Sequence, residues 1–136
     1  MAMRVGPGKH LQGRKLLHGT VSPEEFDYFH ELILAQEAAR HGQRGFADGF
    51  LAGMIIGLPT ILNFGSRTCK ELVVEDVLDG KKFLSLAVSE AAAGSDVAGL
   101  RCKAVLSDDK KHWIVTGTKK WITNGHYSDF FAVCSR

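Results

Sequence analysis

The chain has 136 residues, which is enough for one ordinary hydrophobic core and too short for a complete two-domain enzyme. Hydrophobic residues make up 45% and charged residues 24%, a composition that excludes a disordered or collagen-like chain. Seventeen lysines and arginines against fifteen acids leave a net charge of +2, and nucleic acid is therefore not an expected partner.

The cysteines and histidines predict no metal site. Cys69, Cys102 and Cys134 are far apart and form no C-x-x-C pair, so neither a zinc site nor a disulfide framework is expected. Their odd number favours a reducing compartment. No histidine pair has the spacing of a metalloprotease helix.

Residues 1–21 predict an irregular, basic lead-in, for which an organelle-targeting segment is the alternative. The run Ser22-Pro23-Glu24-Glu25 is typical of a helix start, with a capping hydroxyl and a proline at the first helical position. Apolar residues then recur at helical spacing up to His41-Gly42, which indicates a stop. We expect one helix over residues 23–41.

The stretch from Gly49 to Ser66 carries no charge and reaches the length at which a membrane-spanning helix becomes an alternative. Gly49, Gly53 and Gly57 recur every four residues and would give one helix a face of small residues, suited to close packing. Pro59 interrupts the stretch. We expect two buried helices broken near residues 58–59, and no membrane span.

Ser66 can cap a further helix that ends at Asp79-Gly80. After this helix the sequence changes to short runs of residues that favour β-strands, and the turn over residues 108–111 predicts a hairpin. These features predict an α+β fold, with helices over residues 22–80 and antiparallel strands over residues 81–136. The last run is open-ended, so we expect the chain to be part of a longer protein. The predicted strands cover residues 83–89, 102–107, 112–117, 119–123 and 130–134.

Two clusters could carry chemistry. In the first, the strand run Leu86-Ala87-Val88-Ser89 leads through Glu90 into the small-residue loop Ala93-Gly94-Ser95-Asp96. Small residues let backbone N–H groups approach a ligand closely, which suits a phosphate or another electron-rich group. The alternative is an ordinary turn that Ser95 or Asp96 caps.

The second cluster is Gly117 to Gly125, which ends in an Asn-Gly turn. Strand alternation would put Trp121 and Thr123 on one face, where an aromatic plane and a hydroxyl could hold a flat heteroaromatic cofactor. A tryptophan packed in a β-core is the alternative.

Together these clusters resemble a known family. SLAVSEAAAGSDVAGLRCKA and GTKKWITNG are similar to the two signatures of the acyl-CoA dehydrogenases, at the expected distance from each other. LILAQEAARHG and FGSRTCKELVVEDVLDGKKFLSLA resemble the segments that precede them in that family. The resemblance runs from about Ser22 to Arg136, in order.

The resemblance implies a flavoprotein that binds FAD, in which this chain covers the end of an N-terminal helical domain and the first part of a middle β-domain. The C-terminal helical bundle would be missing. By position, Ser89 would bond the pyrimidine side of the flavin, Trp121 would flank the isoalloxazine and Thr123 would lie near N5. The predicted cofactor-binding residues are Leu86, Val88, Ser89, Gly94, Ser95, Trp121, Ile122 and Thr123, with Ser95 also near the substrate.

The family's reaction converts an acyl-CoA to the trans-2-enoyl-CoA by α-proton abstraction and β-hydride transfer to flavin N5. The catalytic glutamate of the family has no counterpart here, and Glu90 is expected to be structural. We therefore expect no catalytic residue in this chain and no activity from it alone. Implied partners are an acyl-CoA, an acceptor protein or oxygen, and further copies in a homo-oligomer. The compartment could be mitochondrial, peroxisomal or cytoplasmic.

The sequence departs from the family pattern at several positions. Ala91 and Glu75 stand where proline is usual, Lys81 where glutamate is usual, and Ser89 where threonine is usual. The alternatives are a related flavin oxidase or monooxygenase on the same scaffold, or a truncated, non-catalytic interaction module.

Overall fold

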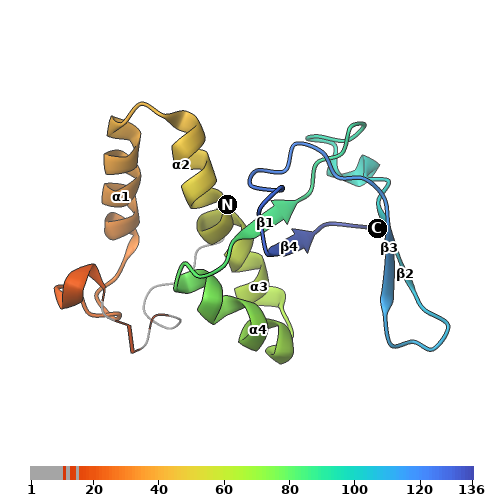
Figure 1. The fold of residues 1–136 in the computed structure, drawn as a ribbon, viewed down its shortest axis with the longest axis horizontal. Coiled ribbons are helices and arrows are strands. Elements are labelled where there is room, and N and C mark those ends of the chain that lie inside the picture. The colour runs from red at the N-terminus through yellow and green to blue at the C-terminus, as the bar shows by residue number, and fades with distance from the viewer. Residues whose placement is uncertain (1–10, 12, 15) are drawn as a thin grey trace.

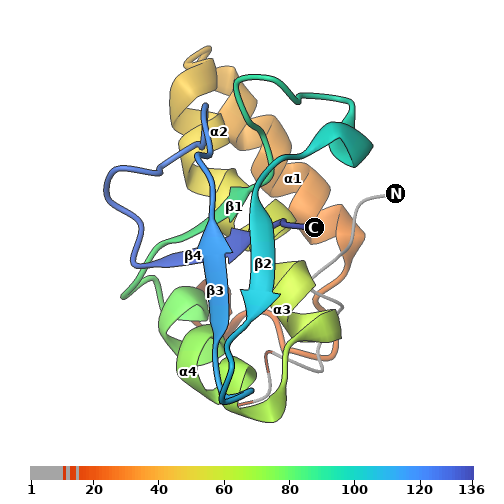
Figure 2. The same ribbon diagram turned by 90° about the vertical axis from the view of Figure 1, so that its right-hand side faces the viewer.

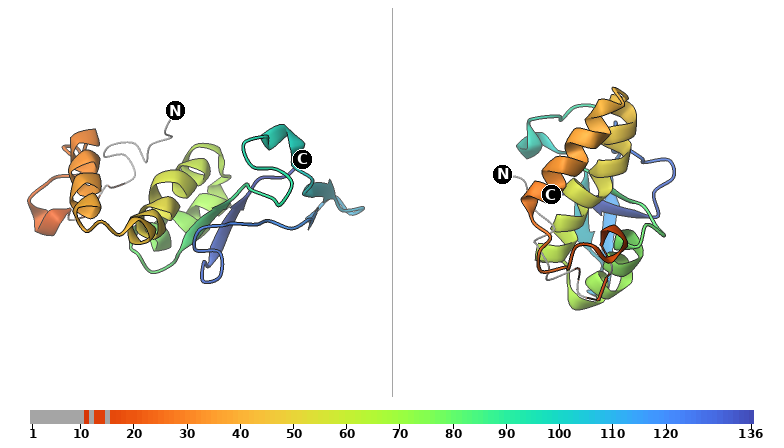
Figure 3. Two further views of the ribbon diagram at one scale, coloured as in Figure 1. Left: turned by 90° about the horizontal axis from the view of Figure 1, so that it is seen from above. Right: turned by 90° about the vertical axis from the view of Figure 1, so that its left-hand side faces the viewer.

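The computed structural model describes residues 11, 13–14 and 16–136, so much of the predicted lead-in over residues 1–21 lies outside the described residues. The molecule is elongated, with helices at one end, a β-hairpin at the other and a parallel strand pair between them (Figures 1 and 3). The predicted α+β class is confirmed.

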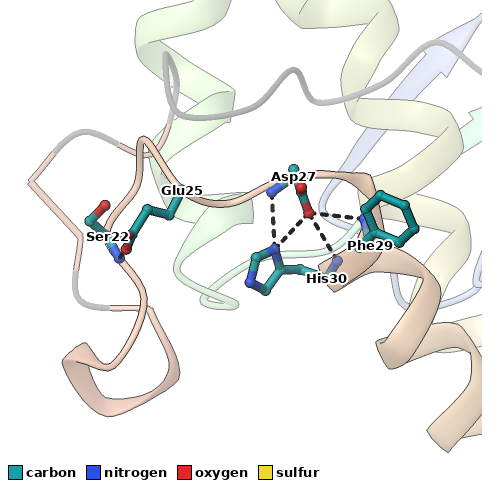
Figure 4. Close-up of polar contacts among 5 residues, drawn as sticks. All are labelled: Ser22, Glu25, Asp27, Phe29 and His30. Carbon is teal, nitrogen blue, oxygen red and sulfur yellow. Dashed lines mark hydrogen bonds and ion pairs between the residues drawn. The ribbon is translucent and has the colours of Figure 1, made fainter.

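The first long helix, α1 (Tyr28–Arg40), begins five residues later than predicted. Pro23, Glu24 and Glu25 form a turn instead, in which the Ser22 amide donates to the Glu25 carboxylate at 3.0 Å. The helix start is capped by Asp27, whose carboxylate accepts from the Phe29 amide at 3.0 Å, while the Asp27 amide donates to His30 Nδ1 at 3.1 Å (Figure 4).

The end of α1 is as predicted. Gly42 has a φ of +64°, and its amide donates to the Ala39 carbonyl at 3.0 Å, which stops the helix. The predicted apolar stripe of α1 is exposed at Phe29, Leu32 and Ile33, so the described part of the chain leaves this face uncovered. A short 3-10 turn, Leu17–Gly19, precedes α1.

The predicted break near Pro59 is wrong. Three segments, α2 (Arg44–Leu51), a π-helical segment (Ala52–Gly57) and α3 (Leu58–Phe64), follow one another without interruption. A proline inside an α-helix removes one hydrogen bond and clashes with the carbonyl four residues earlier, and the wider π turn before Pro59 relieves that clash. Pro59 then lies in the first turn of α3, where proline is tolerated.

This 21-residue helix, Arg44–Phe64, is long and apolar enough to cross a membrane by length and composition, and 28% of its apolar window is buried. Core helices of globular proteins pass the same test. The absence of a membrane span therefore stays a prediction.

The predicted small-residue face makes the close contact expected of it. A Cβ on Gly53 would lie 2.5 Å from the Leu84 carbonyl oxygen, and one on Gly57 would lie 3.3 Å from a Leu84 methyl carbon. A Cβ on Gly49 would lie 3.2 Å from Asn124 Oδ1. The helix therefore approaches strand β1 (Leu84–Ala87) at backbone distance.

Helix α4 (Arg67–Leu78) forms as predicted, capped by Ser66 Oγ, which accepts from the Cys69 amide at 3.2 Å. Gly80, with a φ of +68°, follows its end. Val73 and Val77 of α4 pack with Leu84 and with two leucines of α3 to form the main core. Those two leucines are Leu58 and Leu62.

The strands form two separate pairs. β1 runs parallel to β4 (Phe130–Val133), whereas β2 (Lys103–Leu106) and β3 (Trp113–Thr116) form the predicted antiparallel hairpin. The expectation of antiparallel strands throughout is therefore wrong for β1 and β4, because the long connection between them carries the chain back to the start of β1. Figure 2 shows the hairpin strands running across the direction of β4.

The predicted strand over residues 119–123 does not form. Trp121 has a φ of +63°, in the left-handed region, so the chain turns at this residue instead of extending. A 3-10 turn, Val97–Gly99, lies between β1 and β2.

We predict that Gly53→Ala destabilises the fold by about 1–3 kcal/mol, because the added methyl group meets the Leu84 backbone. Gly45→Ala in the same helix is the matched control, since a methyl group added there would have no other atom within 4 Å. The control substitution should stabilise the helix by about 0.5–1 kcal/mol. Urea unfolding measures both changes, and equal midpoints for Gly53→Ala and the wild type would contradict the close approach.

Candidate functional site

The two clusters singled out in the sequence lie side by side. The Lys120 amide donates to the Ser89 carbonyl at 2.9 Å, and Lys119 Nζ donates to the Val88 carbonyl at 2.8 Å. The segment after β3 therefore runs along the segment that follows β1, although about thirty residues separate them in the sequence. The candidate site is formed by these two segments.

Glu90 is the polar centre of this region. Its side chain is 5% exposed and accepts three hydrogen bonds: from the Arg101 amide at 2.7 Å, from the Cys102 amide at 2.9 Å and from Lys119 Nζ at 2.9 Å. These three donors come from two different parts of the chain. The geometry gives Glu90 the structural role that the sequence predicted.

The same contacts explain the acidity of Glu90. The hydrogen bond from Lys119 lowers its pKa from 4.5 to about 2, assisted by the backbone amides of Arg101 and Cys102 and opposed by desolvation. The carboxylate is therefore ionised across the physiological pH range and paired with a lysine that is only 12% exposed.

The loop after Glu90 is closed by its own backbone. The Glu90 amide donates to the Ala93 carbonyl at 2.9 Å, and the Ala93 amide donates back at 3.2 Å. Beyond this bridge Gly94 and Ser95 are exposed, with open space around Gly94. Asp96 accepts from the Gly99 amide at 3.2 Å, so the turn-capping role weighed for this residue is confirmed.

The segment Trp121–Thr123 is anchored from β1. Ser85 Oγ, on a buried side chain of β1, donates to the Thr123 carbonyl at 2.7 Å and lies 2.6 Å from Ser128 Oγ. Trp121 is 78% exposed, with Lys120 Nζ 4.4 Å from its ring centroid. The strand alternation expected to align Trp121 with Thr123 is absent, and both side chains are instead exposed on a turn.

Asn124 joins this turn to the helices. It is buried, its Nδ2 donates to the Gly49 carbonyl at 2.6 Å, and its Oδ1 accepts from the Tyr127 hydroxyl. Its φ of +64° is one that asparagine tolerates better than most residues. The predicted Asn-Gly turn forms here, with the Gly125 amide donating to the Ile122 carbonyl at 2.9 Å.

The eight predicted cofactor-binding residues thus fall on two neighbouring segments. Leu86, Val88, Ser89 and Ile122 are partly buried, while Gly94, Ser95, Trp121 and Thr123 are exposed. Sequence reasoning missed the residues that anchor them, because only the Asn-Gly pair carries a local signal. The missed anchors are Ser85 and Lys119, together with the hydrogen bond from Asn124 to Gly49.

A cavity of about 180 Å³ lies between the helix and the start of β1, lined mainly by apolar atoms. Phe50, Gly53 and Met54 line it from the helix, and Phe83 and Asn124 line it from the β side. Among the described residues, no group of three or more histidine, cysteine, aspartate or glutamate side chains could hold a metal ion.

Comparisons with known proteins agree on one family. The family model described as acyl-CoA dehydrogenase, middle domain, matches residues 85–136. The acyl-CoA dehydrogenase apdG of Emericella nidulans is 44% identical over 116 residues, which are 85% of this chain and 26% of that protein. The chain thus spans about a quarter of the length of its similar curated relatives.

Two solved structures are similar over most of the chain. One is an acyl-CoA dehydrogenase complexed with FAD from Bacillus anthracis, with a TM-score of 0.70 and 32% identity over 76% of this chain and 18% of that one. The other is a glutaryl-CoA dehydrogenase from Mycobacterium smegmatis in complex with FADH2, with a TM-score of 0.72 and 27% identity over 96% of this chain and 31% of that one.

We predict that Glu90 makes the free energy of unfolding depend on pH at acidic pH. Because its pKa is lower in the folded chain than in the unfolded one, its contribution is complete above pH 4.5 and is lost as the pH falls to about 2. The difference in unfolding free energy between the wild type and Glu90→Gln should therefore shrink over this range. Urea unfolding at a series of pH values measures it, and a difference that does not change with pH would contradict the assignment.

Proposed function

Because the chain belongs to the acyl-CoA dehydrogenase family, we propose that it contributes part of the FAD site of a longer, FAD-dependent acyl-CoA dehydrogenase. The observation that carries this proposal is that the Val88 carbonyl accepts a hydrogen bond from Lys119 and the Ser89 carbonyl accepts one from Lys120. These two bonds bring the two segments of the candidate site together.

The groups on these segments fit a flavin. Ser89, Ser95 and Thr123 carry hydroxyl groups that make no hydrogen bond among the described residues, so each can bond a ligand. A Cβ added at Gly94 would have no other atom within 4 Å, and this open space suits the approach of a pyrophosphate. Trp121 offers an exposed aromatic plane of the kind that stacks on a ring.

We assign the roles accordingly. Trp121 flanks the isoalloxazine, Thr123 bonds near N5 and Ser89 bonds the pyrimidine side. Gly94 and Ser95 bind the pyrophosphate, and Ser95 also lies near the acyl-CoA. Leu86, Val88 and Ile122 contribute their backbone and their apolar surface.

The reaction proposed for the whole enzyme is oxidation of an acyl-CoA to the trans-2-enoyl-CoA, with removal of an α-proton. FAD, when bound, supplies the hydride acceptor for this reaction. Glu90 does not serve as the base, since its carboxylate already accepts three hydrogen bonds and has a pKa of about 2. In this proposal the chain supplies binding and orientation, and the base comes from outside it.

The substrate side of the proposal uses the apolar cavity between the helix and β1. Phe50 and Met54 line it, and Asn124 links it to the turn that carries Thr123. An apolar cavity connected to the flavin segment suits a non-polar acyl chain. An acceptor protein or oxygen, and a homo-oligomeric assembly, complete the proposal.

We predict that Trp121→Ala weakens FAD binding by the full-length enzyme about tenfold or more, because a stacked aromatic ring contributes on the order of 1.4 kcal/mol. Trp121 is 78% exposed, so its removal should leave thermal stability of the apoprotein nearly unchanged. The measurement is the dissociation constant of FAD, from the change in flavin fluorescence.

Trp113→Ala is the matched control for this prediction. Trp113 is likewise exposed, at 66%, but lies on the hairpin strand β3, and its loss should leave FAD affinity unchanged. If both substitutions, or neither, change the affinity, the assigned place of the flavin is wrong.

We also predict that the 136-residue chain alone does not turn over. After incubation with FAD and removal of free cofactor, anaerobic addition of straight-chain acyl-CoAs should cause no bleaching of any retained flavin band, since no base is present. Bleaching that depends on the acyl-CoA would show that a residue of this chain acts as the base.

A further inference from the structure

We propose that Glu90 and Lys119 are positioning residues for the flavin: their buried ion pair holds the Gly94-Ser95 loop and the Trp121–Thr123 turn in one fixed relation, on which FAD affinity depends. This inference rests on the proposed function. Neither residue is among those assigned to contact FAD.

The Glu90–Lys119 pair lies where the two segments of the candidate site meet. Glu90 begins the loop that leads to Gly94 and Ser95, and Lys119 stands two residues before Trp121. Lys119 Nζ donates both to Glu90 Oε1 at 2.9 Å and to the Val88 carbonyl at 2.8 Å, so it crosses directly from one segment to the other. Moving either side chain would shift both segments.

Glu90 also ties a third stretch of chain to this junction. Its two oxygens accept from the amides of Arg101 and Cys102, which lie just before β2. The β2–β3 hairpin and the Lys119 segment are therefore joined to the loop through one carboxylate. Losing it would leave the Arg101 amide and the buried Cys102 amide without this acceptor, and would leave the Lys119 ammonium with the Val88 carbonyl but no counter-charge.

Burial separates this pair from the other ion pairs among the described residues. The side chains of Lys119 and Glu90 are 12% and 5% exposed, whereas in every other pair both side chains are at least 24% exposed. A buried ion pair is weak evidence for stability, because the cost of desolvating both charges offsets much of their attraction. To bind one FAD, the Thr123 hydroxyl, the Trp121 ring and the Gly94-Ser95 loop must keep fixed positions relative to one another.

The test compares Glu90→Gln, Lys119→Met and the double variant in the full-length enzyme. Each single substitution should weaken FAD binding about tenfold or more, and the double variant should be no weaker than the worse single one, because both remove the same link. Arg67→Met is the matched control, since it breaks an exposed ion pair with Glu71 on α4. Its FAD affinity should equal that of the wild type.

A second readout on the apoprotein tests positioning without FAD. In Glu90→Gln the Lys120 amide, bonded to Ser89, should exchange its hydrogen about tenfold faster, while amides of α4 keep their protection. This substitution touches neither the donor nor the acceptor of that bond. Faster exchange therefore reports movement of one segment relative to the other.

Failure of the positioning role and failure of the proposed function would give different results. Variants that lose thermal stability but bind FAD as tightly as the wild type would overturn the positioning role, as would additive losses in the double variant. If the wild-type enzyme retained no FAD, the proposed function would fail, and unchanged exchange at Lys120 would then overturn the link between the segments as well.

Discussion

The packing of β1 against the glycine face of the long helix is the contact on which the rest of the structure depends. Gly53 lies so close to the Leu84 carbonyl that no side chain fits between them, and Leu84 is only 2% exposed. On its other edge β1 pairs with β4. The direction of β1 is thereby fixed, and with it the place at which the chain leaves the strand and enters the candidate site.

Polar groups on and after β1 then determine the shape of that site. Ser85 donates a hydrogen bond to the Thr123 carbonyl, and Glu90 accepts hydrogen bonds from Lys119 and from two backbone amides. In each case a buried polar side chain satisfies groups from a distant part of the chain, and leaving such groups unpaired would cost free energy. The buried side chains of this region thus restrict the geometry, while their neighbours Ser95, Trp121 and Thr123 are exposed.

This division suits the proposal that the chain provides part of a binding surface. The residues proposed to bind FAD are partly or largely exposed, whereas Ser85, Glu90 and Asn124, which hold their segments in place, are buried. Similar curated relatives are about four times longer than the matched part. Because buried hydrogen bonds hold its segments, such a site can bind a ligand or contact further protein without rearranging its own backbone.

The sequence by itself determined what short-range hydrogen bonds and turns control. The Ser66 cap of α4, the Gly42 stop of α1 and the β2–β3 hairpin were predictable because each depends on residues a few positions apart. The family motifs also pointed to the two segments of the candidate site. Local signals misled at the start of α1, where Asp27 caps the helix instead of Ser22, and at Pro59, where a π turn keeps the helix continuous. Only the tertiary structure decided the parallel pairing of β1 with β4, the turn at Trp121 and the Glu90–Lys119 link, because these depend on contacts between residues far apart in the chain.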